Sequence, residues 1–172
     1  METKDFILDM LNHMQRTLDG ALDGLTHDEL KWQPNPEANS IGFTLWHQIR
    51  CEDGFLVSMI QQKPQVWISG KWYQKMGMSD DPQDSGWGYT AEQVTAFPVP
   101  ELKVLVDYGE AVRAKTAEFL KTATPEKMEE KVETGIFGEM TVAQIFSFLL
   151  CELILHTGHI AYIRGLKRGV NK

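Results

Sequence analysis

Four stretches of the chain carry apolar residues at the three- and four-residue spacing that is typical of amphipathic helices. They span residues 4–22, 41–61, 100–122 and 141–169. Local start signals support three of them: Ser40 is a suitable N-cap, Pro100 suits a first helical turn, and Thr141 can form a capping box with Gln144. Four long helices predict an all-α protein, a four-helix bundle with one long crossover loop.

The crossover loop is expected at residues 63–98, where prolines and glycines interrupt every helical pattern. A connection of this length is uncommon in a compact domain and is usually a functional lid or a packed crossover. Its aromatic residues argue against disorder, because disordered segments are poor in them. We therefore expect a packed loop whose aromatic side chains belong to the core or to a pocket wall, with a short helix starting at Thr90.

The shorter connections also carry local signals. Thr26 with Glu29, and Thr124 with Pro125, predict two short helical turns. Residues 32–39 predict a loop, because two prolines and two asparagines leave little else. Glycines within residues 132–140 predict a hairpin-like turn before the last helix.

The expected inner face of the last helix contains three ionisable residues in succession. Steps of three and four give the seam Val142, Ile145, Leu149, Glu152, His156, His159, Ile163 and Leu166. Burying a carboxylate and two imidazoles without partners would cost several kcal/mol. A divalent metal is the simplest compensation, because residues three and four apart project from one helical face. Carboxylate and neutral imidazole are suitable ligands for zinc, nickel, iron or manganese.

The second long helix carries a narrow stripe of small or polar residues beside its apolar face. The stripe comprises Thr44, His47, Cys51, Gly54 and Ser58. Inside a bundle such a stripe lines a cavity or receives a close neighbour, and His47 is its one strong ligand. Cys51 can be a fourth ligand or a reactive thiol, but a small packed residue is favoured. Glu52 lies on the apolar face and is best explained as a partner for another buried polar group.

Composition limits the classes of partner. The 172 residues are expected to form one domain, residues 1–172, with 42% hydrophobic and 24% charged residues as in an ordinary soluble protein. A formal net charge of -7 disfavours nucleic acid and anionic membranes. We expect no membrane span and no export signal, because apolar runs are short of about 20 residues and the N-terminus is acidic. Two cysteines without a paired framework favour reduced thiols and a cytoplasmic location.

Two segments resemble the DinB-like superfamily. NSIGFTLWHQIRCE, residues 39–52, is similar to the family's second helix, in which a histidine follows a Ser-Ile-Gly-type start. ELILHTGHIAYIR, residues 152–164, is similar to its last helix, in which a ligand precedes a histidine by four residues. The resemblance implies a four-helix bundle that holds a divalent metal with three side chains, and it makes a homodimer plausible.

Carried over by position, His47 and His156 match the first and last ligands of the family. Glu152 stands where many members have histidine and one branch has glutamate, and His159 stands where many have glutamine. Two ligand sets therefore remain: His47, Glu152 and His156, which we prefer, or His47, His156 and His159. In the preferred set, His159 contacts the ligands or the bound water.

The resemblance implies three functional hypotheses. The first is a thiol-dependent S-transferase that uses zinc or nickel, or else iron or manganese, and acts on a small molecule with a low-molecular-weight thiol. The second is a metal-dependent hydrolase. The third is a non-catalytic metal-binding or stress-related bundle.

Overall fold

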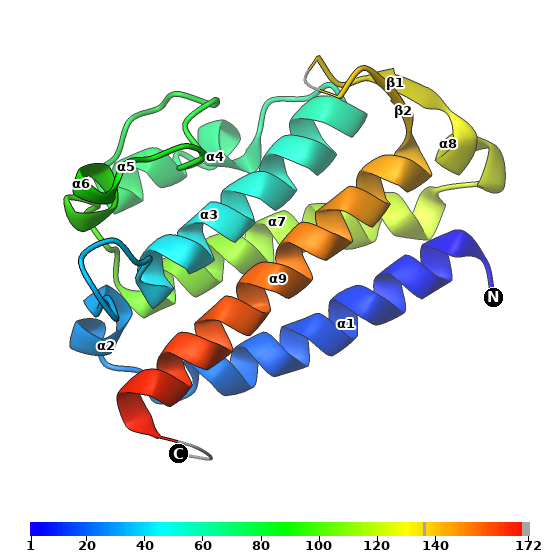
Figure 1. Ribbon diagram of the computed structural model, residues 1–172. Helices are drawn as coiled ribbons and strands as arrows, with labels where there is room; N and C mark the ends of the chain where they lie inside the picture. Colours follow the sequence, from blue (N-terminus) through cyan, green and yellow to red (C-terminus); the bar gives the residue numbers. More distant parts are fainter. Residues whose placement is uncertain (136, 170–172) are drawn as a thin grey trace.

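Four long helices form the body of the molecule in the computed structural model, which describes residues 1–135 and 137–169 (Figure 1). They are α1 (Thr3–Leu22), α3 (Ile41–Asp53, continued by the π-helical segment η1, Gly54–Ile60), α7 (Leu102–Thr122) and α9 (Val142–Arg168). Helix α9 packs along both α1 and α3, and α7 packs on α3. The prediction of an all-α four-helix bundle is confirmed.

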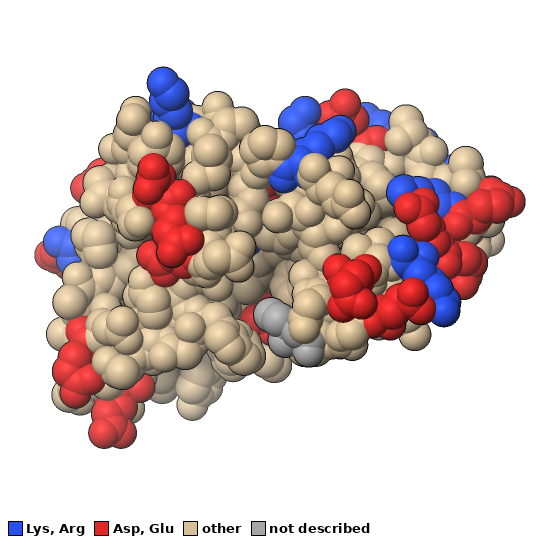
Figure 2. Space-filling model, turned by 90° about the horizontal axis from the view of Figure 1, so that it is seen from above, with Lys and Arg blue, Asp and Glu red and all other residues tan. Residues whose placement is uncertain are grey.

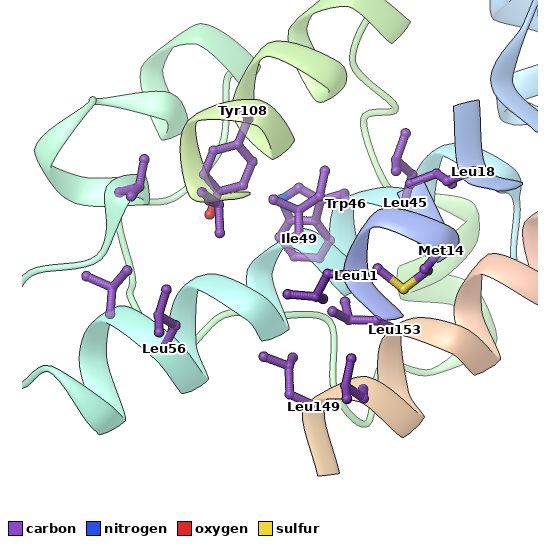
Figure 3. Close-up of a cluster of buried hydrophobic side chains, with 14 of the residues drawn as sticks. Leu11, Met14, Leu18, Leu45, Trp46, Ile49, Leu56, Tyr108, Leu149 and Leu153 are labelled. Carbon is purple, nitrogen blue, oxygen red and sulfur yellow. The ribbon is translucent and has the colours of Figure 1, made fainter. Parts of the chain in front are cut away.

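The core lies where these helices meet. Leu11 and Leu18 of α1, Ile49 of α3 and Leu153 of α9 point toward one another, with Tyr108 of α7 nearby (Figure 3). The expected apolar positions of the helices are mostly the buried ones, because a bundle helix must turn its apolar stripe to its neighbours. Figure 3 also shows Trp46 of α3 within this cluster. Its ring contacts that of Trp67 in the crossover loop, so the core extends into the loop.

The expected helix 41–61 changes its geometry at Gly54. Ser40 caps its start by accepting a hydrogen bond from the Phe43 amide, as predicted. From Gly54 to Ile60 the turns widen to π-helix, which the apolar spacing did not reveal. The change follows Asp53, whose buried carboxylate accepts hydrogen bonds from the amides of Val66 and Trp67 at 2.8 Å. Wide turns of this kind are frequent at functional sites.

The crossover loop is more structured than the sequence indicated. Besides the predicted short helix, α6 (Ala91–Thr95) with Thr90 as its cap, it contains α4 (Val66–Ser69) and α5 (Trp72–Met76). Trp67 and Trp72 are buried against Tyr108 of α7, so they are core residues. Trp87, in contrast, is exposed. The loop is a packed crossover rather than a disordered linker.

Gly86 sets how closely this loop approaches α3. Its φ is +81°, and an added Cβ would lie 2.8 Å from the Trp46 ring and 2.9 Å from the Phe43 ring. We expect Gly86→Ala to lower the free energy of unfolding by about 1–3 kcal/mol, because it adds overpacking to left-handed strain. Urea denaturation measures this loss. Gly88→Ala is the matched control, since Gly88 has φ +74° but open space around it; equal losses in both variants would contradict the close-packing argument.

The short elements agree with the remaining local signals, but the long helix α7 begins later than predicted. The structure has α2 (His27–Lys31), α8 (Pro125–Glu129) and an antiparallel pair of strands, β1 (Lys131–Glu133) and β2 (Glu139–Thr141). Gly135 and Gly138 in the hairpin turn both have positive φ, and Ile136 lies outside the described residues. Helix α7 begins at Leu102 with Glu101 as its N-cap, so Pro100 precedes the helix and is not part of its first turn.

The buried face of α9 differs from the predicted seam in its C-terminal half. The seam holds up to Leu149. Beyond it the buried positions are Leu153, Thr157 and Ile160, together with Ile163 of the predicted seam. The reason is that 3.6 residues per turn drift away from a strict alternation of three and four. His159 and Leu166 are consequently exposed, while Glu152 and His156 lie half-buried on the side that faces α3.

Helix α9 is also long and apolar enough to cross a membrane by length and composition. The sequence predicts no such segment if Glu152 and the polar residues near it are taken to interrupt the apolar run. In the structure α9 packs against α1 and α3 and supplies core residues such as Leu149 and Ile160. This is the arrangement of a core helix in a soluble helical fold.

Candidate metal centre

Three potential metal ligands from two helices meet in the middle of the bundle. His47 comes from α3, and Glu152 and His156 come one turn apart from α9. One ligand atom from each residue can be chosen so that all three lie within 4.8 Å of one another. The two helices pack closely along their length, which brings His47 next to residues more than a hundred positions later. A divalent ion can be held by such a group of donors.

His47 is fixed in the orientation that a ligand needs. Its Nδ1 donates a hydrogen bond to the Ser85 backbone carbonyl at 2.6 Å, and its ring stacks on Phe43. With the proton on Nδ1, the lone pair is on Nε2, which lies 3.4 Å from Glu152 Oε1. The side chain is almost fully buried. The crossover loop thus sets the tautomer of His47.

His156 has the protonation state of a ligand. Burial lowers the pKa of His156 and outweighs the hydrogen bond from Nε2 to Glu152 at 2.9 Å, which raises it. The imidazole is therefore neutral at neutral pH, the form that binds metals. Its Nδ1 is buried without a hydrogen-bond partner among the described residues. The half-buried Glu152 carboxylate thus lies close to the imidazoles of both His47 and His156. Together with the unpaired Nδ1 of His156, this arrangement suits the binding of a divalent metal ion.

His159 lies at the edge of this group. Its ring centroid is 5.4 Å from that of His156, and its side chain is exposed. The three ligand atoms that come together are those of His47, Glu152 and His156, the set preferred from the sequence. His159 is placed where it can contact the group from the solvent side. That these residues bind a metal stays a prediction.

Arg50 supports the candidate site, and the sequence analysis did not identify it. It is buried one turn after His47, and its guanidinium donates to the carbonyls of Asp84 at 3.0 Å and Pro82 at 2.9 Å. These residues directly precede Ser85, so Arg50 holds the loop segment that orients His47. The available signal was the pair Arg50 and Asp53 within an otherwise apolar helix face.

A pocket lies beside the metal centre, between the crossover loop and the hairpin. Its volume is about 360 Å³, and its walls include Cys51, Phe55, Met59, Ser85 and Thr134. Figure 2 shows the surface hollowed between the part of the molecule built by the loop and the part built by the hairpin. Cys51, Gly54 and Ser58 of the predicted small-residue stripe all line this pocket, as expected of a stripe that lines a cavity.

Cys51 separates this pocket from the candidate ligands. Its Sγ is 3.6 Å from His47 Nε2, and neither it nor Cys151 forms a disulfide. Burial, and then the negative charge of Glu152, raise the pKa of the Cys51 thiol to about 12. The thiol is therefore protonated at neutral pH, which agrees with the packed small residue favoured from the sequence.

We expect Cys51→Ala to keep the metal content of the protein. A neutral buried thiol contributes packing, and its removal costs little compared with a ligand. Elemental mass spectrometry of the purified variant beside the wild type measures this. A loss of metal as large as that in His47→Ala would instead make Cys51 a fourth ligand.

Comparison with known proteins identifies the family. Residues 10–160 match the DinB superfamily. A solved structure described as a conserved protein from Enterococcus faecalis superposes with a TM-score of 0.85 at 23% identity, covering 96% of this chain and 97% of that chain. At this identity the likeness concerns the fold. A search of curated proteins found no match. The match over most of the chain, together with the bundle and its His-Glu-His group, places the protein in the DinB superfamily.

Proposed function

We propose that this protein is a divalent-metal-dependent enzyme, and specifically a transferase that joins a low-molecular-weight thiol to an electrophilic small molecule. The observation that carries the proposal is the group of His47, Glu152 and His156. Three protein ligands leave coordination positions for a thiol or water, as in catalytic metal sites. No second carboxylate belongs to this group of described residues, so a dedicated carboxylate base for water is missing from it.

Separate groups of residues would hold the metal ion and contact the substrate. His47, Glu152 and His156 would hold the ion, and the Ser85 carbonyl keeps the His47 ring in place. When bound, the ion supplies Lewis acidity that lowers the pKa of a thiol or water. The pocket beside Cys51 offers apolar walls from Phe55 and Met59 to an electrophile. In the transfer, the thiol loses its proton to solvent, its sulfur bonds to the electrophilic carbon, and the leaving group departs with its electron pair.

The test is thiol transfer by metal-loaded protein. Zinc- and nickel-loaded samples are assayed with bacillithiol, mycothiol and glutathione analogues and a generic electrophile, beside His156→Ala treated identically. We expect turnover with at least one thiol in the wild type and none above background in His156→Ala. Lack of turnover with every thiol in a sample shown to contain metal would refute the transferase.

A hydrolase is the second candidate, because two histidines and one glutamate are also a ligand set of catalytic zinc sites that activate water. Hydrolysis of ester and amide panels without added thiol distinguishes it from the transferase. If neither activity is found while metal is bound, the remaining explanation is a bundle that binds metal without catalysis.

A further inference from the structure

A second cavity lies on the other side of α3 from the candidate metal centre, between α1, α3 and α7. Its volume is about 350 Å³, within the range of small-molecule pockets. Leu18 and Leu22 of α1, Leu45 of α3 and Leu105 of α7 supply apolar walls. Helices α1 and α7 pack against each other less extensively than α1 packs against α9 or α7 packs against α3. The small side chains Ala114 and Ala117 leave the space between α1 and α7 unfilled.

Gln48 lines this cavity with a side chain whose amide oxygen is unpaired. Gln48 is 2% exposed, and its Oε1 has no hydrogen-bond partner among the residues that the structure describes. An unpaired buried amide costs about 1–3 kcal/mol, so it is rarely kept without a function. A side-chain amide can present either its oxygen or its nitrogen after rotation. Gln48 therefore offers a hydrogen-bonding group to a molecule within the cavity.

The cavity is lined by more negatively than positively charged side chains. Among the described residues that line it, the one cation is Arg113, which is already paired. Its Nε and Nη2 each donate to Glu52 at 2.8 Å, and Glu52 also accepts from Thr116. This confirms the structural role expected of Glu52. The exposed carboxylates Asp19 and Glu110 also line the cavity. The field at the opening is therefore negative, which repels an anionic ligand and attracts a cationic one.

We propose that this cavity binds a small apolar amine. Its hydrocarbon part lies among the leucines of α1, α3 and α7, and its ammonium group donates a hydrogen bond to the Gln48 amide oxygen, with Asp19 and Glu110 supplying the attractive field. A carboxylic acid of the same shape is excluded by these charges. The site needs no metal, and it is independent of the proposed function, because Gln48 lines this cavity and none of His47, Glu152 and His156 does.

The test is calorimetric titration of the full chain with three probes of one shape: phenylethylamine, phenylethanol and phenylacetate. We expect the amine to bind most tightly, the alcohol more weakly and the acid not at all. Gln48→Leu should weaken amine binding by at least about tenfold, since it removes the hydrogen bond and keeps the volume. Ala117→Phe should abolish binding by filling the cavity.

Two further variants make the outcome decisive. Ala161→Phe, on the exposed face of α9, is the matched control and should bind the amine as the wild type does. Ala114→Trp, at an exposed lining position, replaces Ala117→Phe if that variant does not fold. The proposal is overturned if no probe binds the wild type, if the three probes bind equally, or if filling the cavity leaves binding unchanged.

Discussion

Alanine at His47 or His156 is expected to remove nearly all bound metal from the purified protein while the bundle stays folded. Each substitution deletes one of three ligands, so the loss of affinity should exceed the roughly 10- to 100-fold caused by changing a residue that only supports a ligand. The fold should survive, because these variants keep all the buried apolar residues through which α3 and α9 pack together. The measurement is metal content by elemental mass spectrometry after reconstitution with zinc, nickel and manganese, with circular dichroism as the check of folding.

Variants of the neighbouring residues separate the two ligand sets. Glu152→Ala should lose metal as His47→Ala does, because Glu152 Oε1 lies close to both imidazoles. His159→Ala should retain most of it, because His159 is exposed and outside the group. The reverse pattern would establish the alternative set of His47, His156 and His159. A wild type without metal after reconstitution would remove the basis of the proposed enzyme.

Sequence periodicity was sufficient to predict the four long helices and to choose the candidate ligands that the structure brings together. Glu152 and His156 are four residues apart, so any helix through them must place both on one face. His47 stood out as the one strong ligand on a stripe of small residues. The exposure of His159 was missed because a seam counted strictly in steps of three and four makes no allowance for the drift of 3.6 residues per turn along a helix as long as α9.

The parts of the site that come from the crossover loop could not be predicted. Ser85 contributes a backbone carbonyl, which any residue type could supply, so its identity carries no signal. The apolar spacing along each helix also does not predict the two cavities. They depend on where small residues such as Ala117 leave space between neighbouring helices. The unpaired amide oxygen of Gln48 becomes informative only when its surroundings are known.

Arg50 connects the loop to the candidate metal centre, and its loss is expected to have two separable effects. All three of its nitrogens donate: Nε to the Asp84 carbonyl, Nη1 to Gln65 Oε1, and Nη2 to the Pro82 carbonyl. The guanidinium also lies 4.5 Å above the Trp67 ring. A lysine cannot replace this fork of donors. Arg50 is thus the link between the core of the bundle and the segment that ends at Ser85.

We expect Arg50→Met to lower the free energy of unfolding by about 3–5 kcal/mol, the usual result of removing one partner of a buried charge pair. The partner is Asp53, 3.8 Å away, whose pKa burial already raises. In the folded fraction, the Ser85 carbonyl is no longer held, so the His47 ring is freer to turn and metal affinity should fall by roughly 10- to 100-fold. Urea denaturation of the metal-free protein and competition with a chromophoric chelator measure the two effects.

Arg113→Met is the matched control, because it also removes a guanidinium from a buried carboxylate, Glu52, but Arg113 touches no residue of the loop. It should destabilise the protein to a similar degree and leave metal affinity within about twofold of the wild type. If both variants lose metal affinity in proportion to their loss of free energy of unfolding, Arg50 affects the site only through the stability of the whole fold. If Arg50→Met loses affinity while Arg113→Met does not, the crossover loop controls the geometry of the metal site through one buried side chain, and changes in that loop can tune the site without altering any ligand.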